Sequence, residues 1–225
     1  MDYGVYLVTE AGLAGDRTTT DVVRDAVAGG VDAIQLREKT ASARERYDLG
    51  RNLRALTREA GVDLIVNDRV DIARAIDADG VHLGDDDLPV DVAREQLGED
   101  AVIGRSVSTV EGAREAEAAG ADYLGVGAVY RTGTKDTGPH QTAIGLERVQ
   151  AIRAAVSVPF VGIGGIDAEN AADVVAAGAD GVAVVSAVMA AEDPTAATMA
   201  LDEAVAAGRD RGGPSDAGNV SEAER

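Results

Sequence analysis

The two lysines are the residues of this chain that point most directly to chemistry. Lys39 and Lys135 are the only lysines, and every other basic residue is an arginine. Lys39 ends the segment Gln35-Leu36-Arg37-Glu38-Lys39, in which Arg37 and Lys39 are two residues apart and can point the same way. Two cations at the end of a strand suit a phosphate or a diphosphate group.

Lys135 ends a second segment that suits an anion, Thr132-Gly133-Thr134-Lys135. Its two hydroxyls, flexible backbone and cation together can cradle an anion. The spacing is not that of a Walker A loop. Further phosphate ligands are expected from Ser106 and, through backbone N–H groups, from Gly165 and from Val185-Ser186.

Acidic residues follow two neighbouring expected strands, as Asn67-Asp68 and as Asp87. Carboxylates from adjacent strand ends can share one Mg²⁺ beside phosphate. Two alternatives stay open: Asp68 as a helix N-cap, and residues 85–87 as an acidic surface turn. His82 is expected inside the fold rather than on a metal.

The elements that must position these residues are eight short apolar runs that alternate with longer segments of helical period. The expected strands are Val5–Val8, Ala33–Leu36, Leu64–Val66, Gly80–Leu83, Val102–Gly104, Tyr123–Val126, Phe160–Ile163 and Gly181–Val185. The expected helices are 18–29, 41–60, 69–77, 89–97, 109–119, 143–155, 167–177 and 195–207.

The junctions before several strands repeat a Gly-x-Asp pattern, as in Gly30-Val31-Asp32. Glycine suits the position past a helix end, and the aspartate can hydrogen-bond the local backbone. Strands that alternate with helices form parallel sheets, and eight such units predict a single (β/α)8 TIM barrel over residues 1–208. A doubly wound open sheet is the alternative, although its Gly-x-Gly-x-x-Gly motif does not follow the first strand. Residues 209–225 are expected to form a disordered acidic tail.

The composition excludes several classes of function. The 225 residues include 40 acidic and 21 basic side chains, a net charge of -19, which argues against nucleic acid and anionic lipid as partners. Cysteine is absent, so a Cys nucleophile and disulfides are excluded, and no Ser-His-Asp order favours acyl transfer. No signal peptide or membrane span is expected, which predicts a cytoplasmic protein, and the acidity is typical of a high-salt environment. The oligomeric state is open, a homo-oligomer included.

Taken in order, these motifs resemble the thiamine-phosphate synthase family from about Tyr3 to Ala207. Besides the segments named above, the resemblance includes Val81-His82-Leu83-Gly84, Ile103-Gly104, Gly125-Val126-Gly127 and Gly162-Ile163-Gly164-Gly165-Ile166. It implies a TIM-barrel enzyme that joins 4-amino-5-hydroxymethyl-2-methylpyrimidine diphosphate to a hydroxyethylthiazole phosphate, simple or carboxylated. The products are thiamine phosphate and diphosphate.

The resemblance also implies a role for each matched segment, with Lys39 and Lys135 as electrostatic stabilisers and no strong acid or base. Residues implied for the pyrimidine diphosphate are Gln35, Leu36, Arg37, Glu38, Lys39, Asn67, Ser106 and Lys135. Those implied for the thiazole phosphate are Thr132, Gly133, Thr134, Gly165, Val185 and Ser186. One Mg²⁺ per subunit is implied on Asp68 and Asp87.

Three residues depart from the family pattern: Asp85 replaces a frequent Gln, Ser108 a frequent His and Arg131 a common Pro. Ser108 is expected instead to cap the following helix. Two other interpretations remain. A thiazole tautomerase would lack much of the diphosphate and metal half, and a phosphate-ligand sensor would bind without turnover.

Overall fold

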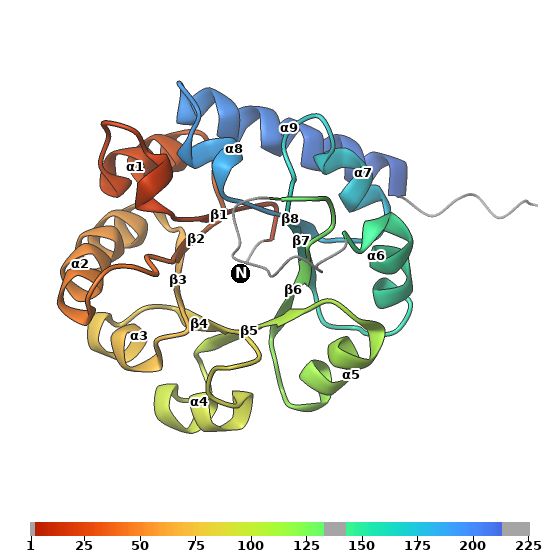
Figure 1. The fold of residues 1–225 in the computed structure, drawn as a ribbon, viewed down its shortest axis with the longest axis horizontal. Coiled ribbons are helices and arrows are strands. Elements are labelled where there is room, and N and C mark those ends of the chain that lie inside the picture. Colours follow the sequence, from red (N-terminus) through yellow and green to blue (C-terminus); the bar gives the residue numbers. More distant parts are fainter. Residues whose placement is uncertain (1–2, 133–142, 213–225) are drawn as a thin grey trace, which may run out of the picture.

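The fold is a closed barrel of eight parallel strands, in a computed structural model that describes residues 3–132 and 143–212 (Figure 1). The strands pair in chain order, and β8 pairs with β1, which confirms the barrel and excludes the open sheet. The strands are β1 (Val5–Val8), β2 (Ala33–Leu36), β3 (Asp63–Asn67), β4 (Gly80–Leu83), β5 (Val102–Val107), β6 (Tyr123–Gly127), β7 (Phe160–Ile163) and β8 (Gly181–Val184).

The helices form a ring around the barrel (Figure 1). They are α1 (Thr19–Ala28), α2 (Ala43–Ala60), α3 (Val70–Ile76), α4 (Val90–Leu97), α5 (Val110–Ala118), α6 (Gly145–Arg153), α7 (Ala171–Ala176), α8 (Ser186–Met189) and α9 (Pro194–Gly212), with a short 3₁₀ helix at Ala11–Leu13. Neither α8 nor the 3₁₀ helix was expected. Residues 209–212, expected in the tail, continue α9, and residues 213–225 lie outside the described residues.

Polar side chains fix where the helices begin. Thr18 and Ser42 each accept a hydrogen bond from the third residue of the following helix, whose own carboxylate bonds back to the cap. Such a capping box satisfies backbone N–H groups that a helix start leaves unpaired. The expectation for Ser108 was wrong: α5 is capped by Thr109, whose hydroxyl accepts from Gly112 N–H at 3.0 Å.

The core has two layers because alternate strand residues face opposite sides of the sheet. The larger layer lies between the barrel and the helices and includes Leu36, Leu83 and Leu124. The smaller layer fills the barrel, and its buried members are Tyr6, Val8, Ala33, Ile65, Tyr123, Val161 and Ala183. Side chains therefore fill the barrel towards the amino ends of the strands, and a site can form at the carboxyl ends.

Four aspartates join the strands in pairs where the strands begin. They lie directly before the even-numbered strands and are Asp32, Asp79, Asp122 and Asp180. Each carboxylate accepts from a backbone N–H of the preceding odd-numbered strand at 2.7–2.8 Å, and each aspartate N–H donates to the carbonyl of that same residue. We call this reciprocal pair of bonds the strand-pair clamp. The expected bond to the local backbone is thus replaced by a bond to the neighbouring strand.

Arginines on the helices support the clamps that hold β4, β6 and β8. Arg54 of α2 holds Asp79 through two hydrogen bonds of 2.6 and 2.9 Å, with Arg54 only 15% exposed. Arg94 of α4 forms an ion pair with Asp122, before β6, at 2.6 Å, and Arg153 of α6 forms one with Asp180, before β8, at 3.3 Å. Hydrogen-bonded charges at this depth stabilise more than exposed pairs do.

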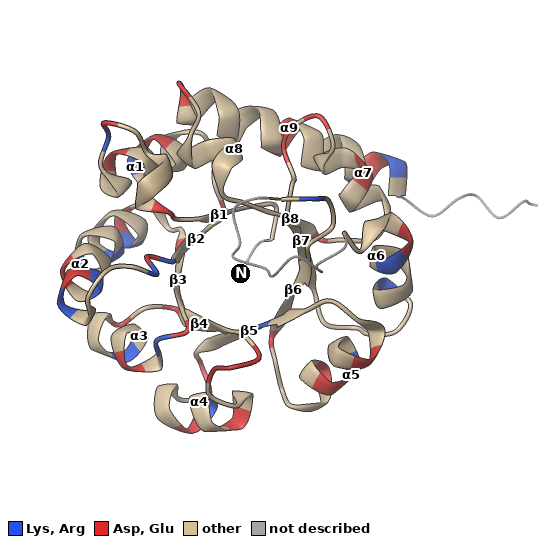
Figure 2. Ribbon diagram, in the orientation of Figure 1, with Lys and Arg blue, Asp and Glu red and all other residues tan. Residues whose placement is uncertain are grey.

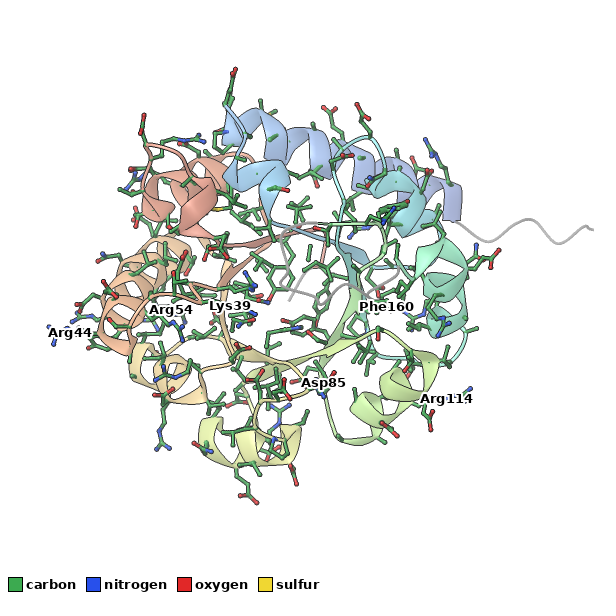
Figure 3. The ribbon with its side chains drawn as sticks, in the orientation of Figure 1. Lys39, Arg44, Arg54, Asp85, Arg114 and Phe160 are labelled. Atoms are coloured by element: carbon green, nitrogen blue, oxygen red, sulfur yellow. The ribbon has the colours of Figure 1, made fainter. Side chains whose placement is uncertain are left out.

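Charge is concentrated on the helices and loops (Figure 2). Acidic residues outnumber basic ones over the whole chain. Arg44 and Arg114 lie at the outer edge of the ring, whereas Lys39 and Asp85 lie towards its centre (Figure 3). Within the described part of the chain, no helix is long and apolar enough to span a lipid bilayer.

Candidate active site

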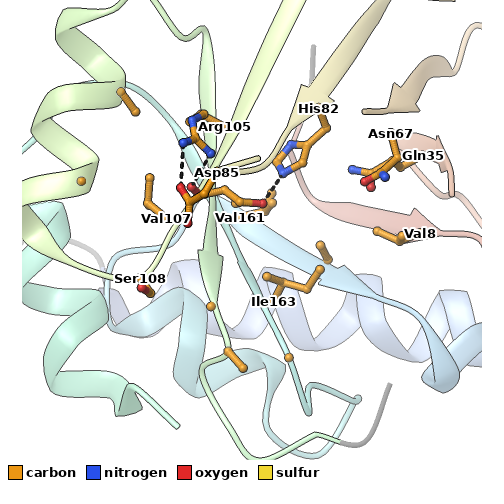
Figure 4. A pocket seen from close by; sticks show the side chains of 18 of the residues that line it. Val8, Gln35, Asn67, His82, Asp85, Arg105, Val107, Ser108, Val161 and Ile163 are labelled. Carbon is orange, nitrogen blue, oxygen red and sulfur yellow. Dashed lines mark hydrogen bonds and ion pairs between the residues drawn. The ribbon is translucent and has the colours of Figure 1, made fainter. Parts of the chain in front are cut away.

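A cavity of about 920 Å³ opens at the carboxyl ends of the strands. All eight strands contribute to its wall, and Gln35, Asn67 and His82 face it (Figure 4). The cavity extends outward between α4 and α5, along residues such as Val90 and Gly112. Active sites of TIM barrels lie at this end, so the residues of the wall are the candidates for chemistry.

The structure brings together four residues expected on the pyrimidine diphosphate: Gln35, Arg37, Asn67 and Ser106 all line the cavity. Arg37 is 11% exposed and forms an ion pair with Glu10 at 2.8 Å, which fixes its guanidinium at the end of β2.

Lys39 is exposed. The charges of Lys39 and Arg37 partly oppose the rise in the pKa of Asp68 that burial and Asp87 cause, so the two cations lie near that carboxyl.

Two members of the same segment point away from the cavity. Leu36 is buried in the layer between barrel and helices. Glu38 is also buried, and its carboxylate accepts from Ala11 N–H at 3.0 Å and from the Thr19 hydroxyl at 3.3 Å. Their side chains therefore hold the segment in place, and only their backbone is left for a ligand.

The carboxyls of Asp68, after β3, and Asp87, after β4, lie within hydrogen-bonding reach of each other, and Asn67 and Asp85 from the same strand ends line the cavity. Asp68 has a left-handed backbone, with φ 63°, and its N–H donates to His82 O at 2.9 Å. Asp87 accepts from Gly84 N–H at 2.6 Å. Asp68 is not the helix cap, because α3 begins after Arg69 with no side-chain cap.

The Asp68–Asp87 pair fits a divalent cation. Burial first, and then the adjacent Asp87 carboxyl, raise the pKa of Asp68 to about 6. A carboxyl whose charge is destabilised by an adjacent carboxyl favours a cation between the two. Among the described residues no three acidic, His or Cys side chains form a metal site.

The proposed thiazole-phosphate side is partly described. Thr132, Gly165, Val185 and Ser186 line the cavity, and the last two begin α8, where N–H groups lack partners within the helix. Gly165 has φ 65°, and a Cβ there would lie 2.6 Å from the Arg131 carbonyl oxygen, so no other residue fits without strain. Gly133, Thr134 and Lys135 lie outside the described residues.

One of the three departing residues, Asp85, has a structural partner of its own. Asp85 forms an ion pair with Arg105 at 2.7 Å on the cavity wall (Figure 4). Arg105 also donates to the carbonyl of Leu83 at 3.3 Å. Ser108 lines the cavity, and Arg131 is exposed. Sequence reasoning missed Arg105 as a wall residue, although a cation directly after an expected strand is the same signal as Arg37. It also missed Tyr6, which does not stand out by type within an expected strand.

The comparisons with known proteins agree with this geometry. Residues 5–188 match the family described as thiamine monophosphate synthase. The chain belongs to this thiamine-phosphate synthase family. A thiamine-phosphate synthase of Natronomonas pharaonis is 66% identical over 205 residues, 91% of this chain and 96% of that protein. Another, from Haloarcula marismortui, is 63% identical over 210 residues, 93% and 100% of the two chains.

A solved structure supports the same assignment. Thiamine phosphate pyrophosphorylase from Pyrococcus furiosus is 44% identical, with a TM-score of 0.84, over 92% of this chain and 98% of that one. As a member of the thiamine-phosphate synthase family the chain is an enzyme, a transferase, and the interpretation as a sensor without turnover is not retained. Relatives that are named synthases at this identity also disfavour the tautomerase.

Proposed function

We propose that this enzyme joins 4-amino-5-hydroxymethyl-2-methylpyrimidine diphosphate to hydroxyethylthiazole phosphate, giving thiamine phosphate and diphosphate. The carbon–oxygen bond to the diphosphate breaks, and the leaving diphosphate takes the electron pair. The thiazole nitrogen supplies the pair for the new bond to the same carbon. A carboxylated thiazole phosphate would also have to lose carbon dioxide to reach the same product.

The observation that carries this proposal is the paired carboxyls of Asp68 and Asp87 beside Arg37 and Lys39. A diphosphate with a divalent cation needs both cationic side chains and oxygen ligands for the metal. A tautomerase that acts only on the thiazole phosphate has no use for such a site.

The pyrimidine diphosphate is assigned to the β2–β5 side of the cavity. Gln35 and Asn67 would face the ring, Arg37 and Lys39 would face the phosphates, and Ser106 would supply a hydroxyl. Support comes from Gln35, Asn67, Arg37 and Ser106, which line the cavity. Leu36 and Glu38 are left with backbone contacts only. Lys135 is assigned to the same diphosphate on the strength of the family resemblance.

Asp68 and Asp87 would hold one Mg²⁺, which when bound neutralises charge that develops on the departing diphosphate. The arginine and lysine side chains contribute to the same electrostatic stabilisation. No strong base is required, because the attacking thiazole nitrogen carries no proton to remove.

The thiazole phosphate is assigned to the β6–β8 side. Thr132, Gly133, Thr134 and Gly165 would surround the phosphate, and the N–H groups of Val185 and Ser186 would complete the site. Bound there, the thiazole lies across the cavity from the pyrimidine, so the enzyme contributes by alignment and by excluding water.

The test is the release of diphosphate by the purified protein with both substrates, each varied in turn, with and without Mg²⁺. We expect release that needs both substrates and stops when the metal is chelated. Release with the pyrimidine diphosphate alone would make the protein a hydrolase. No release with either thiazole phosphate would refute the proposed reaction.

A further inference from the structure

A continuous chain of hydrogen-bonded side chains crosses the inside of the barrel. Gln35 Nε2 donates to the Tyr6 hydroxyl at 3.0 Å, and Tyr6 and Tyr123 share a bond of 2.7 Å between their hydroxyls. The Tyr123 hydroxyl lies 2.9 Å from His82 Nδ1, and His82 Nε2 lies 2.9 Å from Ser106 Oγ. We call Tyr6, Tyr123 and His82 the interior relay. It connects two residues, Gln35 and Ser106, that line the cavity from different strands.

The barrel is built around this relay. A Cβ on Gly104 would lie 2.2 Å from Tyr123 Cζ and 2.5 Å from His82 Nδ1, and one on Gly125 would lie 2.9 Å from His82 Cε1. Tyr6 and Tyr123 are almost completely buried and His82 is 8% exposed. Buried polar groups cost free energy unless each is hydrogen-bonded, and apolar residues would fill the same space without that cost. The relay therefore needs an explanation other than stability.

The direction of the bonds follows from counting protons. With Gln35 Nε2 donating to the Tyr6 hydroxyl, the Tyr123 hydroxyl at 2.7 Å is the acceptor that the described side chains offer to the Tyr6 proton. The Tyr123 hydroxyl then donates its own proton to His82 Nδ1, which must be unprotonated to accept it. The ring proton of His82 is therefore on Nε2, which donates to the Ser106 hydroxyl. The opposite direction would take the Tyr123 acceptor away from the buried Tyr6 proton, which is unfavourable.

We propose that Tyr6, Tyr123 and His82 are positioning residues that fix the polarity of the pyrimidine site. They hold Gln35 with its amide nitrogen turned to Tyr6 and its carbonyl oxygen available to the cavity, and they leave the Ser106 hydroxyl as a donor. A ligand must then offer an N–H donor to Gln35 and an acceptor atom to Ser106. An aminopyrimidine diphosphate meets both demands, because its amino group donates to Gln35 and a ring nitrogen can accept from Ser106. In the oxo analogue a carbonyl oxygen replaces the amino group, so two acceptors, the analogue and Gln35, would face each other. The inference rests on the proposed function for the identity of the ligand.

The proton position can be tested without any turnover. The chain has two histidines, His82 and His140, so ¹⁵N-histidine NMR of the full chain gives two ring systems, and His140→Gln assigns them. Under mildly alkaline conditions an ordinary imidazole is neutral. We expect His82 to carry its proton on Nε2, and Tyr123→Phe to remove that preference. A proton on Nδ1 in the unsubstituted protein would overturn the inference, even if synthase activity is confirmed.

Kinetics test the consequence. Tyr123→Phe should raise KM for the pyrimidine diphosphate about tenfold and leave KM for the thiazole phosphate within about twofold, the loss expected when one hydrogen bond no longer orients its partner. Discrimination against the oxo analogue should fall as well. Tyr47→Phe, which removes a hydroxyl on α2 outside the relay, is the matched control and should behave as the unsubstituted enzyme.

A Tyr123→Phe enzyme that is folded, as judged by its thermal melt, and keeps both its KM values and its discrimination would also refute the positioning role. If the unsubstituted protein fails to release diphosphate, the proposed function fails, and the NMR result still decides the direction of the relay.

Discussion

The strand-pair clamp of β3 and β4 offers a sharp test of how this barrel divides stability from catalysis. Asp79 accepts from Leu64 N–H at 2.7 Å and from both terminal nitrogens of Arg54 at 2.6 and 2.9 Å. Asp79→Asn keeps the size of the side chain but turns an NH₂ group towards one of these donors.

The expected loss is about 3 kcal/mol. One charge-assisted hydrogen bond contributes about 1.5–3 kcal/mol, and Arg54, which is 15% exposed, also loses its counter-charge. For a chain of this length the melting temperature should fall by about 2–4 °C per kcal/mol.

Asp77 provides the matched control two residues away. Asp77 forms an ion pair at 2.6 Å with Arg58, which lies on α2 as Arg54 does. Asp77 is 85% exposed, however, and Arg58 is 60% exposed. Asp77→Asn keeps a residue that tolerates the left-handed backbone there, with φ 55°, and should cost under about 1 kcal/mol.

The assay is urea unfolding of both variants, followed by diphosphate release at a temperature where both are folded. Asp79 lies at the opposite end of the barrel from the cavity, so we expect unchanged KM values. Equal losses for Asp77→Asn and Asp79→Asn would refute the energetic reasoning. A raised KM in Asp79→Asn would refute the separation of the two ends.

Four further predictions follow from the site and the composition. Asp68→Asn and Asp87→Asn should each raise the Mg²⁺ concentration needed for half-maximal diphosphate release by about tenfold or more; an unchanged Mg²⁺ dependence in both would remove them as ligands. Gly165→Ala, forced to φ 65° against a backbone oxygen at 2.6 Å, should raise KM for the thiazole phosphate while KM for the pyrimidine diphosphate stays constant. With a net charge of -19, the protein should melt at higher temperature as KCl is added, and a flat response would show that self-repulsion is negligible. Burial raises the pKa of the Tyr6 and Tyr123 hydroxyls above the usual value near 10, so stability should fall as pH rises past about 10, and tyrosinate absorbance should appear together with unfolding rather than before it.

The apolar runs predicted the barrel well because each strand is buried on both faces. The prediction for β5 stopped at Gly104, but the strand continues through Ser106 to Val107, which pairs with Val126 of β6. A hydrophobic pattern ends where polar residues begin, while backbone pairing continues, and the polar extension is where the site lies. The helix α8 was missed because four residues are too few to show a period.

The site was predicted best where residue type carries the information. Arg37 and Asp68 could be placed near each other because both follow neighbouring parallel strands. Tyr6 and Tyr123 could not, since each reads as one more apolar strand residue. Their contact joins β1 to β6, which are brought together only when the barrel closes.

The strand-pair clamps also divide the chain into four successive βαβα modules. Each clamp joins two strands of the same module, for example β3 with β4. The supporting arginines come from the preceding module: Arg54 of α2 binds Asp79, and Arg94 of α4 binds Asp122. The two half-barrels β1–β4 and β5–β8 therefore each contain two complete clamps. A polypeptide divided after α4 keeps all four clamps intramolecular, while division between β5 and β6 breaks one. The end of the barrel where the strands begin thus has the regularity of a fourfold tandem repeat. The opposite end, which holds the cavity, does not share that repeat.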